Sequence, residues 1–308
     1  MKALADPARL RLVALCRQGE CSVSELACVI GLSQPRVSQH LRQLCESGLL
    51  DRFRDGRRIF YRMAPGRATG AQRLVGLIPT DEPLLDTDAA LLKSLRATDR
   101  ETSVAVRQDA HRRVAGRPYV SRPDASKRGA EETDAGDRAL HRALLDLTVA
   151  APVGDLLDIG CGRGRTLKLL ANRANRAVGV DIDATARQLA RTELLLAGLP
   201  NCSLRYGDMY RLPFEDREFD TVILDDVLGI AERPASALLE AKRLLRDGGR
   251  LVILQRLASA RSGELQRALA EWSSAAGLRL GPARLVPAIQ PQWLLSAATL
   301  AAGNVAAA

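Results

Sequence analysis

The stretch VGDLLDIGCGRGRTLKLL, residues 153–170, decides the fold of the larger part of the chain. An apolar run ends at Asp158, three glycines follow at alternate positions, and a helical pattern begins directly after them. Such glycines let the backbone turn sharply from strand to helix and pass close to a ligand. A second apolar run at 177–182 contains the acid Asp181 near its end, where a carboxylate can bind ribose hydroxyls. The pattern predicts an α/β fold that binds a nucleotide.

Strand and helix patterns continue to alternate from about residue 138 onward, which predicts a parallel sheet. The spacing GxGxG behind an acid resembles motif I of class I methyltransferases that use S-adenosylmethionine (SAM), and it fits the dinucleotide fingerprint GxGxxG less well. CSLRYGDMYRLPF at 202–214 resembles the third strand and its loop, EFDTVILDDVLG at 218–229 the fourth strand, and LLRDGGRLVIL at 244–254 the turn into the fifth. The resemblance implies a Rossmann-like fold with SAM as cofactor. A similar domain that binds another nucleotide, or none, is the alternative.

The resemblance also implies a set of cofactor contacts. Asp208 would hold the adenine amine, and Met209 would pack on the adenine ring. The full set of expected cofactor-binding residues is Asp158, Gly160, Gly162, Gly164, Asp181, Ile182, Asp208, Met209 and Leu224.

Two acids after the expected fourth strand, Asp225 and Asp226, are the candidate catalytic residues. They lie where the mouth of the active site opens in such folds. They could steer a cationic substrate or remove a proton. They could equally be solvated loop acids, because SAM carries an activated methyl group and the protein mainly has to position the acceptor.

The first 65 residues predict an α+β winged helix-turn-helix. Asp6 followed by Pro7 is a helix-start signal. Val37, Leu41 and Leu44 recur at helical spacing, which predicts the inward face of a third helix. The segment LLDRFRDGRRIFYRM at 49–63 then predicts two strands around a turn at Asp55-Gly56. Helices followed by a basic hairpin form this architecture.

Charge and side-chain type favour DNA as the partner of this segment. The chain has a net charge of +9, and residues 1–65 hold eleven basic against six acidic residues, a net charge of +5. Polar groups on the third helix are of the kind that bind base edges, and arginines of the hairpin would contact phosphates. A helical bundle with a solvated polar face is the alternative. The expected DNA-binding residues are Ser33, Gln34, Arg36, Ser38, Gln39, His40 and Arg42 on the helix, with Arg54, Arg57 and Arg58 (and Arg52 beside them) in the hairpin.

Three stretches of this segment resemble the ArsR/SmtB family of winged-helix repressors: residues 2–16, 23–50 and 55–63. The resemblance implies a homodimer that binds an operator palindrome in double-stranded DNA, with a ligand changing the affinity. Metalloid-sensing members carry a CVC arrangement where this chain has Ser-Val-Ser at 22–24, and hydroxyls are poor ligands for soft metals. We therefore predict no metal site. The four N-terminal cysteines, at positions 16, 21, 28 and 45, could form a thiol trio or be small, packed cysteines.

Together the two halves resemble bacterial fusions of an ArsR-type regulator with a SAM-dependent methyltransferase. We expect a winged helix-turn-helix at 1–65, a helical connection and polar loop at 66–137, with the loop at 117–137, and the methyltransferase domain at 138–308 with its core at 153–256. The resemblance is incomplete around the expected acceptor site. Family members often carry an aromatic-rich segment before the first strand, where this chain has only Tyr119, and tend to carry histidines after the fourth strand, where it has Asp225, Asp226 and Gly229.

Three functions remain open: a regulator with an active methyltransferase domain, a regulator that only senses SAM or S-adenosylhomocysteine, and a methyltransferase whose winged helix serves dimerisation. Arsenite as acceptor is disfavoured, because the C-terminal part holds only Cys161 and Cys202. The sequence shows no signal peptide and no membrane-spanning stretch, and its scattered cysteines suggest a reducing cytoplasm.

Overall fold

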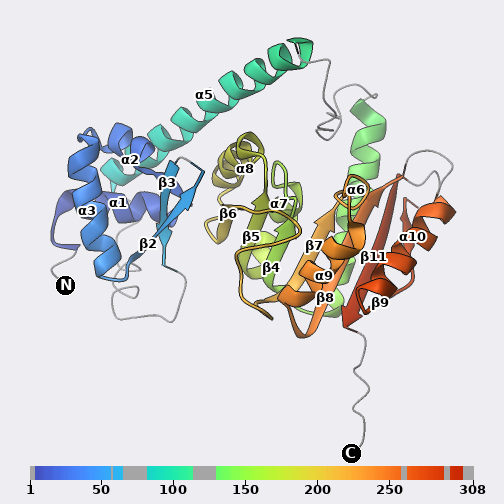
Figure 1. Cartoon of the computed structure of the whole chain (residues 1–308). Coiled ribbons are helices and arrows are strands. Elements are labelled where there is room, and N and C mark those ends of the chain that lie inside the picture. Colours follow the sequence, from blue (N-terminus) through green and yellow to red (C-terminus); the bar gives the residue numbers. More distant parts are fainter. Residues whose placement is uncertain are drawn as a thin grey trace, which may run out of the picture. The chain divides into compact units, whose positions relative to one another are not determined.

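The computed structural model describes residues 4–56, 58–64, 82–113, 130–257, 262–287 and 292–300 (Figure 1). By their internal contacts the residues form two units. The first comprises residues 1–115 together with 183–206, and the second comprises 116–182 together with 207–308. The segment 183–206, which the sequence pattern places among the strands and helices of the α/β domain, is thus grouped with the N-terminal residues.

The first unit is built from helices around a small sheet. In chain order its elements are α1 (Pro7–Arg17), β1 (Cys21–Ser22), α2 (Val23–Ile30), α3 (Gln34–Glu46), β2 (Leu50–Asp55), β3 (Arg58–Met63), α5 (Pro83–Arg113), α8 (Ala184–Leu196) and β6 (Cys202–Tyr206). Val37, Leu41 and Leu44 of α3 are fully buried, which confirms the predicted inward face. Leu92 of α5 and Leu195 of α8 join the same apolar core.

The sheet of this unit has the strand order β1-β3-β2, with antiparallel neighbours. Asp55 and Arg58 face each other at the end of the β2–β3 hairpin, and Gly56 in the turn has a φ of 62°, a left-handed conformation that favours glycine. The predicted turn is confirmed. Helix–turn–helix followed by this hairpin is the winged helix-turn-helix architecture, and we call the β2–β3 hairpin the wing.

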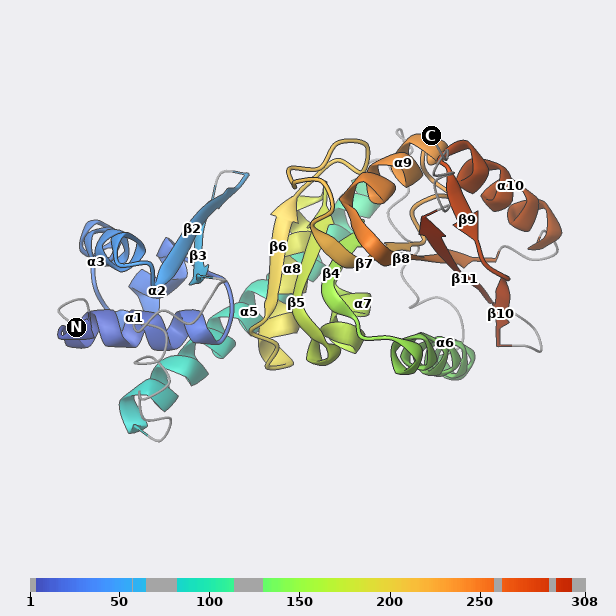
Figure 2. The ribbon, with the colours of Figure 1, turned by 90° about the horizontal axis from the view of Figure 1, so that it is seen from below.

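The second unit is an α/β fold. In chain order its elements are α6 (Ala130–Ala150), β4 (Gly154–Ile159), α7 (Arg165–Leu170), the 3-10 turn η3 (Ala171–Arg173), β5 (Ala174–Asp181), β7 (Phe219–Asp225), α9 (Pro234–Leu244), β8 (Leu245–Arg256), α10 (Ser262–Ala275), β9 (Leu278–Leu280), β10 (Arg284–Val286) and β11 (Trp293–Leu300). Within this unit the strands follow in the order β10-β11-β8-β7-β4-β5, and β9 pairs with β11. Figure 2 shows α9 and α10 on one face of the sheet and α6 and α7 on the other.

Strands β5, β4, β7 and β8 of this sheet run parallel, and β11 joins β8 antiparallel. The parallel strands are buried on both faces, with Leu157, Val222 and Ile253 in one apolar core. This arrangement confirms the predicted Rossmann-like domain. The carboxyl ends of the parallel strands lie at one edge of the sheet, which is where ligands bind in such folds.

The predicted loop at 117–137 is wrong at its C-terminal end, because the backbone is helical from Ala130 onward in α6. The sequence AEETDAGD at 130–137 starts with good helix formers, and its acids lie in the first turns, where the helix dipole favours negative charge. The segment lacks apolar residues at helical spacing, which is why its pattern resembles that of a loop. Residues 114–129 of that segment lie outside the described residues.

Among the described helices, none combines the length and the apolar character that crossing a membrane requires.

Candidate cofactor-binding and DNA-binding sites

The loop after β4 carries the three predicted glycines, and each has a positive φ. The φ angles of Gly160, Gly162 and Gly164 are 71°, 54° and 75°, values that residues other than glycine rarely adopt. At Gly160 there is also no room, because a Cβ atom would collide with the side chain of Val227. The backbone N–H groups of Gly160 and Cys161 both donate to the carbonyl oxygen of Val180, at 2.8 and 3.0 Å. The loop is therefore held tightly against the end of β5.

Asp181, the last residue of β5, connects two of the predicted loops. The backbone N–H of Gly162 donates to its Oδ2 at 2.8 Å. The backbone N–H of Gly207 donates to its carbonyl oxygen at 3.3 Å, which brings the following residue, Asp208, to the same edge of the sheet. A carboxylate accepts several hydrogen bonds at once, so Asp181 can hold the glycine loop and still bind hydroxyl groups.

The apolar candidates differ in how they could meet a ligand. Ile182 is 55% exposed, which is unusual for a large aliphatic side chain and suits contact with a flat base. Met209 is half-buried and packs against the core. Leu224 is fully buried in β7, so its side chain belongs to the core. Asp158 is also fully buried, at the carboxyl half of β4.

Asp208 is exposed, and its Oδ1 accepts a hydrogen bond from the backbone N–H of Tyr210 at 3.1 Å. This local turn leaves the carboxylate at the surface of the loop. Around Asp181 the structure thus brings together the backbone of the glycine loop and two acids, Asp181 itself and the exposed Asp208. That donor and acceptor set fits a nucleoside with a ribose and an amino-substituted base.

Asp225 is held by Arg165 and Thr166, which precede it by about sixty residues in the sequence. Its side chain is about 2% exposed. The hydroxyl of Thr166 donates to Oδ2 at 2.7 Å, and Nη2 of Arg165 donates to Oδ1 at 3.0 Å. Both partners follow the glycine loop directly at the start of α7. Asp225 therefore fixes the first turn of α7 to the end of β7.

Asp226 has a φ of 59°, an uncommon conformation for a residue with a side chain. Its Oδ1 accepts hydrogen bonds from Nε2 of Gln255 at 2.6 Å and from the backbone N–H of Arg256 at 3.0 Å. These bonds tie it to the end of β8. The guanidinium groups of Arg165 and Arg256 lie 4.5 and 4.6 Å from the ring centroid of Trp293, which is itself buried.

Both candidate catalytic acids are thus engaged by neighbouring groups. One signal for this arrangement lay in the sequence, since Arg165 and Thr166 directly follow the glycine loop. No sequence pattern indicated that Trp293 would lie against Arg165 and Arg256, because it belongs to a strand more than sixty residues further along the chain than the two acids.

The polar face of α3 is largely accessible. Gln34, Arg36, Gln39 and Arg42 are exposed, as is Ser33 at the N-cap position. Ser38 and His40 are half-buried. Nδ1 of His40 lies 4.0 Å from Oδ1 of Asp6, so this imidazole is turned toward the start of α1.

In the wing, Arg52, Arg54 and Arg58 are exposed, and Nε of Arg54 donates to the carbonyl oxygen of Gly56 at 2.9 Å. Arg57 lies outside the described residues. Exposed arginines on a hairpin beside an exposed polar helix are the arrangement that a winged helix needs for duplex DNA.

The cysteines of the first unit are free thiols with different surroundings. Cys16 and Cys21 are buried, and Cys28 is exposed. A hydrogen bond with Cys21, together with burial, raises the pKa of the Cys16 thiol. Among the described residues there is no group of three or more histidines, cysteines or acids that could hold a metal ion.

Comparison with family models gives two matches. Residues 6–52 match the model of bacterial regulatory proteins of the arsR family, and residues 157–253 match a methyltransferase domain. The first match contains α1 to α3, and the second runs from β4 into β8.

Known proteins match each part. The arsenic resistance transcriptional regulator ArsR1 of Pseudomonas putida is 36% identical over 30% of this chain and 75% of its own length. A 37.1 kDa protein in transposon TN4556 of Streptomyces fradiae is 32% identical over 63% of this chain, and the chain covers only 56% of its length. A SAM-dependent methyltransferase structure from Aquifex aeolicus is 18% identical over 51% of this chain and 88% of that one, with a TM-score of 0.46.

A winged helix-turn-helix with the family's sequence pattern and a Rossmann-like unit with a glycine loop are therefore joined in one polypeptide. The chain belongs to the ArsR family of bacterial regulatory proteins and carries a methyltransferase domain after its winged helix-turn-helix.

Proposed function

We propose that this protein is a transcription regulator that binds operator DNA as a homodimer and binds SAM in its methyltransferase domain, where the methyl group is transferred to an acceptor. The observation that carries the cofactor assignment is the position of Asp181. This one acid is hydrogen-bonded to the glycine loop through Gly162 and to the following loop through Gly207. The carboxylate accepts the bond from Gly162 and the backbone carbonyl oxygen accepts the bond from Gly207, so two loops meet at the end of β5, where such folds bind a nucleoside.

In this proposal each candidate residue has a distinct task. Asp181 binds the ribose hydroxyls, and the backbone of Gly160 to Gly164 passes along the rest of the cofactor. Ile182 and Met209 pack on the two faces of adenine, and Asp208 accepts a hydrogen bond from its amine. SAM itself supplies a methyl group activated on a sulfonium, so the protein contributes mainly position and exclusion of water.

Calorimetry with SAM on the full chain tests the cofactor site. Asp181→Ala should weaken binding at least about tenfold, since hydrogen bonds to a charged group contribute about 1.5–3 kcal/mol. The matched control is Asp247→Ala, because Asp247 is an exposed acid whose partner is Arg217. Equal affinities of the Asp181 variant and the unmodified protein would refute the proposed ribose contact.

A gel shift with DNA from the protein's own promoter region tests the second half of the proposal. Arg36→Ala on α3 should weaken binding by about 1–3 kcal/mol if this arginine contacts a base edge. Lys93→Ala removes the same charge from an exposed position on α5 and should leave binding unchanged. Absence of any shift at physiological salt would instead favour a methyltransferase whose winged helix serves dimerisation.

One observation favours a second candidate, a regulator that senses SAM or S-adenosylhomocysteine without catalysis. Asp225 and Asp226 are each bound by neighbouring groups, so neither is presented as a general base. Methyl transfer from labelled SAM into a cell extract separates the two candidates. A labelled product supports the methyltransferase, and SAM binding without a product supports the sensor.

A further inference from the structure

The wing of the first unit has one accessible face and one covered face. Side chains alternate along a strand, so Phe53 and Asp55 lie on the side of β2 opposite to Arg52 and Arg54. Phe53 pairs with Phe60 across the hairpin, and the two rings stack with centroids 5.8 Å apart. Both arginines are exposed, while Asp55 is buried. The accessible face carries the charges expected to meet DNA.

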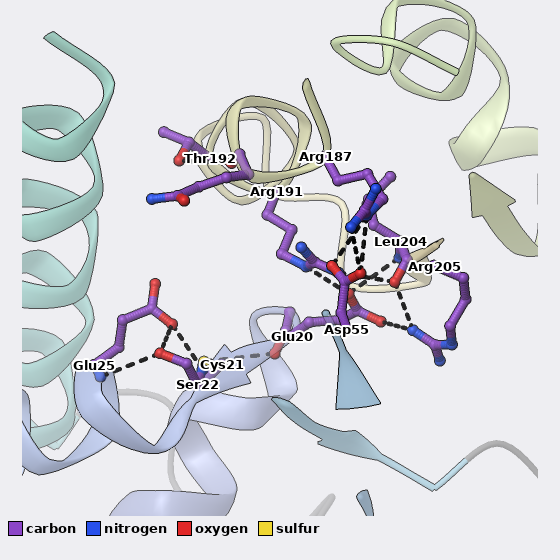
Figure 3. A network of polar contacts seen from close by, with 12 residues as sticks. Glu20, Cys21, Ser22, Glu25, Asp55, Arg187, Arg191, Thr192, Leu204 and Arg205 are labelled. Carbon is purple, nitrogen blue, oxygen red and sulfur yellow. Dashed lines mark hydrogen bonds and ion pairs between the residues drawn. The ribbon is translucent and has the colours of Figure 1, made fainter. Parts of the chain in front are cut away.

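Asp55 is bound by two arginines of α8. Nη2 of Arg187 lies 2.7 Å from Oδ1, and Nη2 of Arg191 lies 2.7 Å from Oδ2 (Figure 3). The three side chains are only 4%, 2% and 5% exposed, respectively. Burial raises the pKa of Asp55, but the two guanidinium groups lower it further, so the net shift is downward and the carboxylate stays charged.

The aromatic rings of the same face are covered by guanidinium groups. The guanidinium carbon of Arg191 lies 4.0 Å from the ring centroid of Phe60, and that of Arg205, on β6, lies 3.4 Å from the centroid of Phe53. Cations over aromatic faces are attracted more strongly where water is excluded. We call Arg187, Arg191 and Arg205 the wing clamp.

The wing clamp also holds the segment that leads into α2. Glu20, which lies between α1 and β1, is 3% exposed at its side chain. Nε of Arg191 lies 3.0 Å from Oε2, and Nη1 of Arg205 lies 2.6 Å from Oε1. The backbone N–H of Leu204 donates to Oε2 at 3.0 Å. One set of arginines thus binds the wing and the base of the helix-turn-helix together, as Figure 3 shows.

The chain order gives the segment 183–206 a particular position. It begins at Asp183, the N-cap of α8, two residues after Asp181. It ends at Tyr206, two residues before Asp208. We call residues 183–206, which carry the wing clamp, the clamp segment. In the sequence it connects Asp181 and Asp208, the two acids proposed to bind the ribose and the adenine.

We propose that SAM or S-adenosylhomocysteine controls the DNA affinity of the winged helix through the wing clamp. Ligand bound at Asp181 and Asp208 fixes both ends of the clamp segment, and the clamped wing presents Arg52 and Arg54 to the phosphates. Buried ion pairs favour a two-state response, because a partly broken network leaves a buried charge without a partner. A ligand shifts such an equilibrium only as far as it prefers one state. This inference rests on the proposed SAM binding.

Fluorescence anisotropy with promoter DNA, with and without saturating SAM, tests the coupling in the full chain. In the unmodified protein SAM should tighten DNA binding by about tenfold, within the range of typical coupling energies. Asp55→Asn should bring the ratio of the two dissociation constants to about 1, because the wing loses its ion pairs with Arg187 and Arg191 and no longer responds to a ligand that fixes the clamp. Asp51→Asn is the matched control on the same strand, since its contact with Arg62 is longer, at 3.6 Å, and half-exposed. It should keep the ratio of the unmodified protein.

A double variant, Asp55→Asn with Arg187→Gln, provides the same test where the single variant folds poorly, since it neutralises both partners of one pair. Calorimetry on each variant keeps the outcomes apart. SAM binding without any change in DNA affinity in the unmodified protein would overturn the coupling and leave the cofactor assignment intact. A coupling that survives in both Asp55 variants would overturn the role of the clamp. Lack of SAM binding would refute the proposed function, and the ligand-driven clamp with it.

Discussion

Asp55 and Asp225 are two buried carboxylates at strand ends, and they differ in what their arginine partners do. Asp55 binds the wing to two arginines that are themselves buried and lie more than 130 residues further along the chain. Asp225 binds Arg165, which is 30% exposed and starts the helix after the glycine loop. The first pair joins distant segments, and the second shapes a loop beside the candidate cofactor site. An Asp–Arg ion pair therefore stabilises the packing of distant segments in the first unit and fixes the conformation of one loop in the second.

Arg191→Ala should have the largest effect of the variants considered. It removes a shared partner of Asp55 and Glu20, and loss of one partner from a buried pair costs about 3–5 kcal/mol. Urea denaturation followed by circular dichroism measures the free energy of unfolding. Arg217→Ala, at an exposed pair with Asp247, is the control and should cost less than about 1 kcal/mol. Similar losses in both variants would show that burial does not distinguish the two pairs.

Asp225→Asn should have an intermediate effect on stability and on cofactor affinity. The hydrogen bonds from Thr166 and Arg165 lose a charged acceptor, at a cost of about 1–3 kcal/mol, and the glycine loop loosens. Thermal unfolding and calorimetry with SAM measure the two effects. Thr166→Ser keeps the hydroxyl and should stay close to the unmodified protein. Loss of methyl transfer with unchanged stability and affinity would instead assign Asp225 a chemical role.

The acid dependence of stability should carry a contribution from Asp55. Because its pKa is lowered in the folded protein, the ionised form favours folding at every pH above the ordinary value of 3.8. That contribution is lost as the pH falls through the lowered pKa. The difference in unfolding free energy between the unmodified protein and Asp55→Asn should be constant from pH 7 to about 5 and shrink below 4. A difference that stays constant down to pH 2.5 would contradict this prediction.

The smallest effect concerns the reactivity of the Cys202 thiol, which lies in the same segment as the wing clamp. Burial, reinforced by the nearby carboxylate of Glu20, raises the pKa of Cys202 to about 12, whereas Cys28 is exposed on α2. Alkylation by iodoacetamide requires the thiolate, so Cys28 should react at pH 8 while Cys202 stays unmodified. Mass spectrometry of the peptides measures both. Modification of Cys202 at the rate of Cys28 would mean that the segment opens readily.

Local patterns predicted much of the fold. Val37, Leu41 and Leu44 share one side of a helix whatever surrounds them, and the Asp55-Gly56 turn needs a glycine at its left-handed position. The glycine loop after β4 was recognisable for the same reason. The helical start of α6 was missed, because helix formers without apolar anchors look like a solvated loop.

The partners of the acids could not be predicted in this way. The sequence around Asp55 indicates only a turn residue. No neighbouring residue indicates that Arg187 and Arg191 bind its carboxylate. From the sequence, Asp225 and Asp226 suit a catalytic site and a solvated loop equally well. The tertiary structure places Thr166 and Arg165 beside the first acid and Gln255 beside the second. Local sequence specifies which residues are charged but leaves their distant neighbours open.

The amino-acid sequence by itself determined the two kinds of fold, their order along the chain and the positions of the glycine loop and the polar helix, because periodicity and turn chemistry act between near neighbours. The tertiary structure alone decided that residues 183–206 associate with the N-terminal unit and that their arginines cover one face of the wing. Interactions of that kind depend on bringing segments more than a hundred residues apart into one buried environment, where the dielectric is low and a charge is stable only beside its partner.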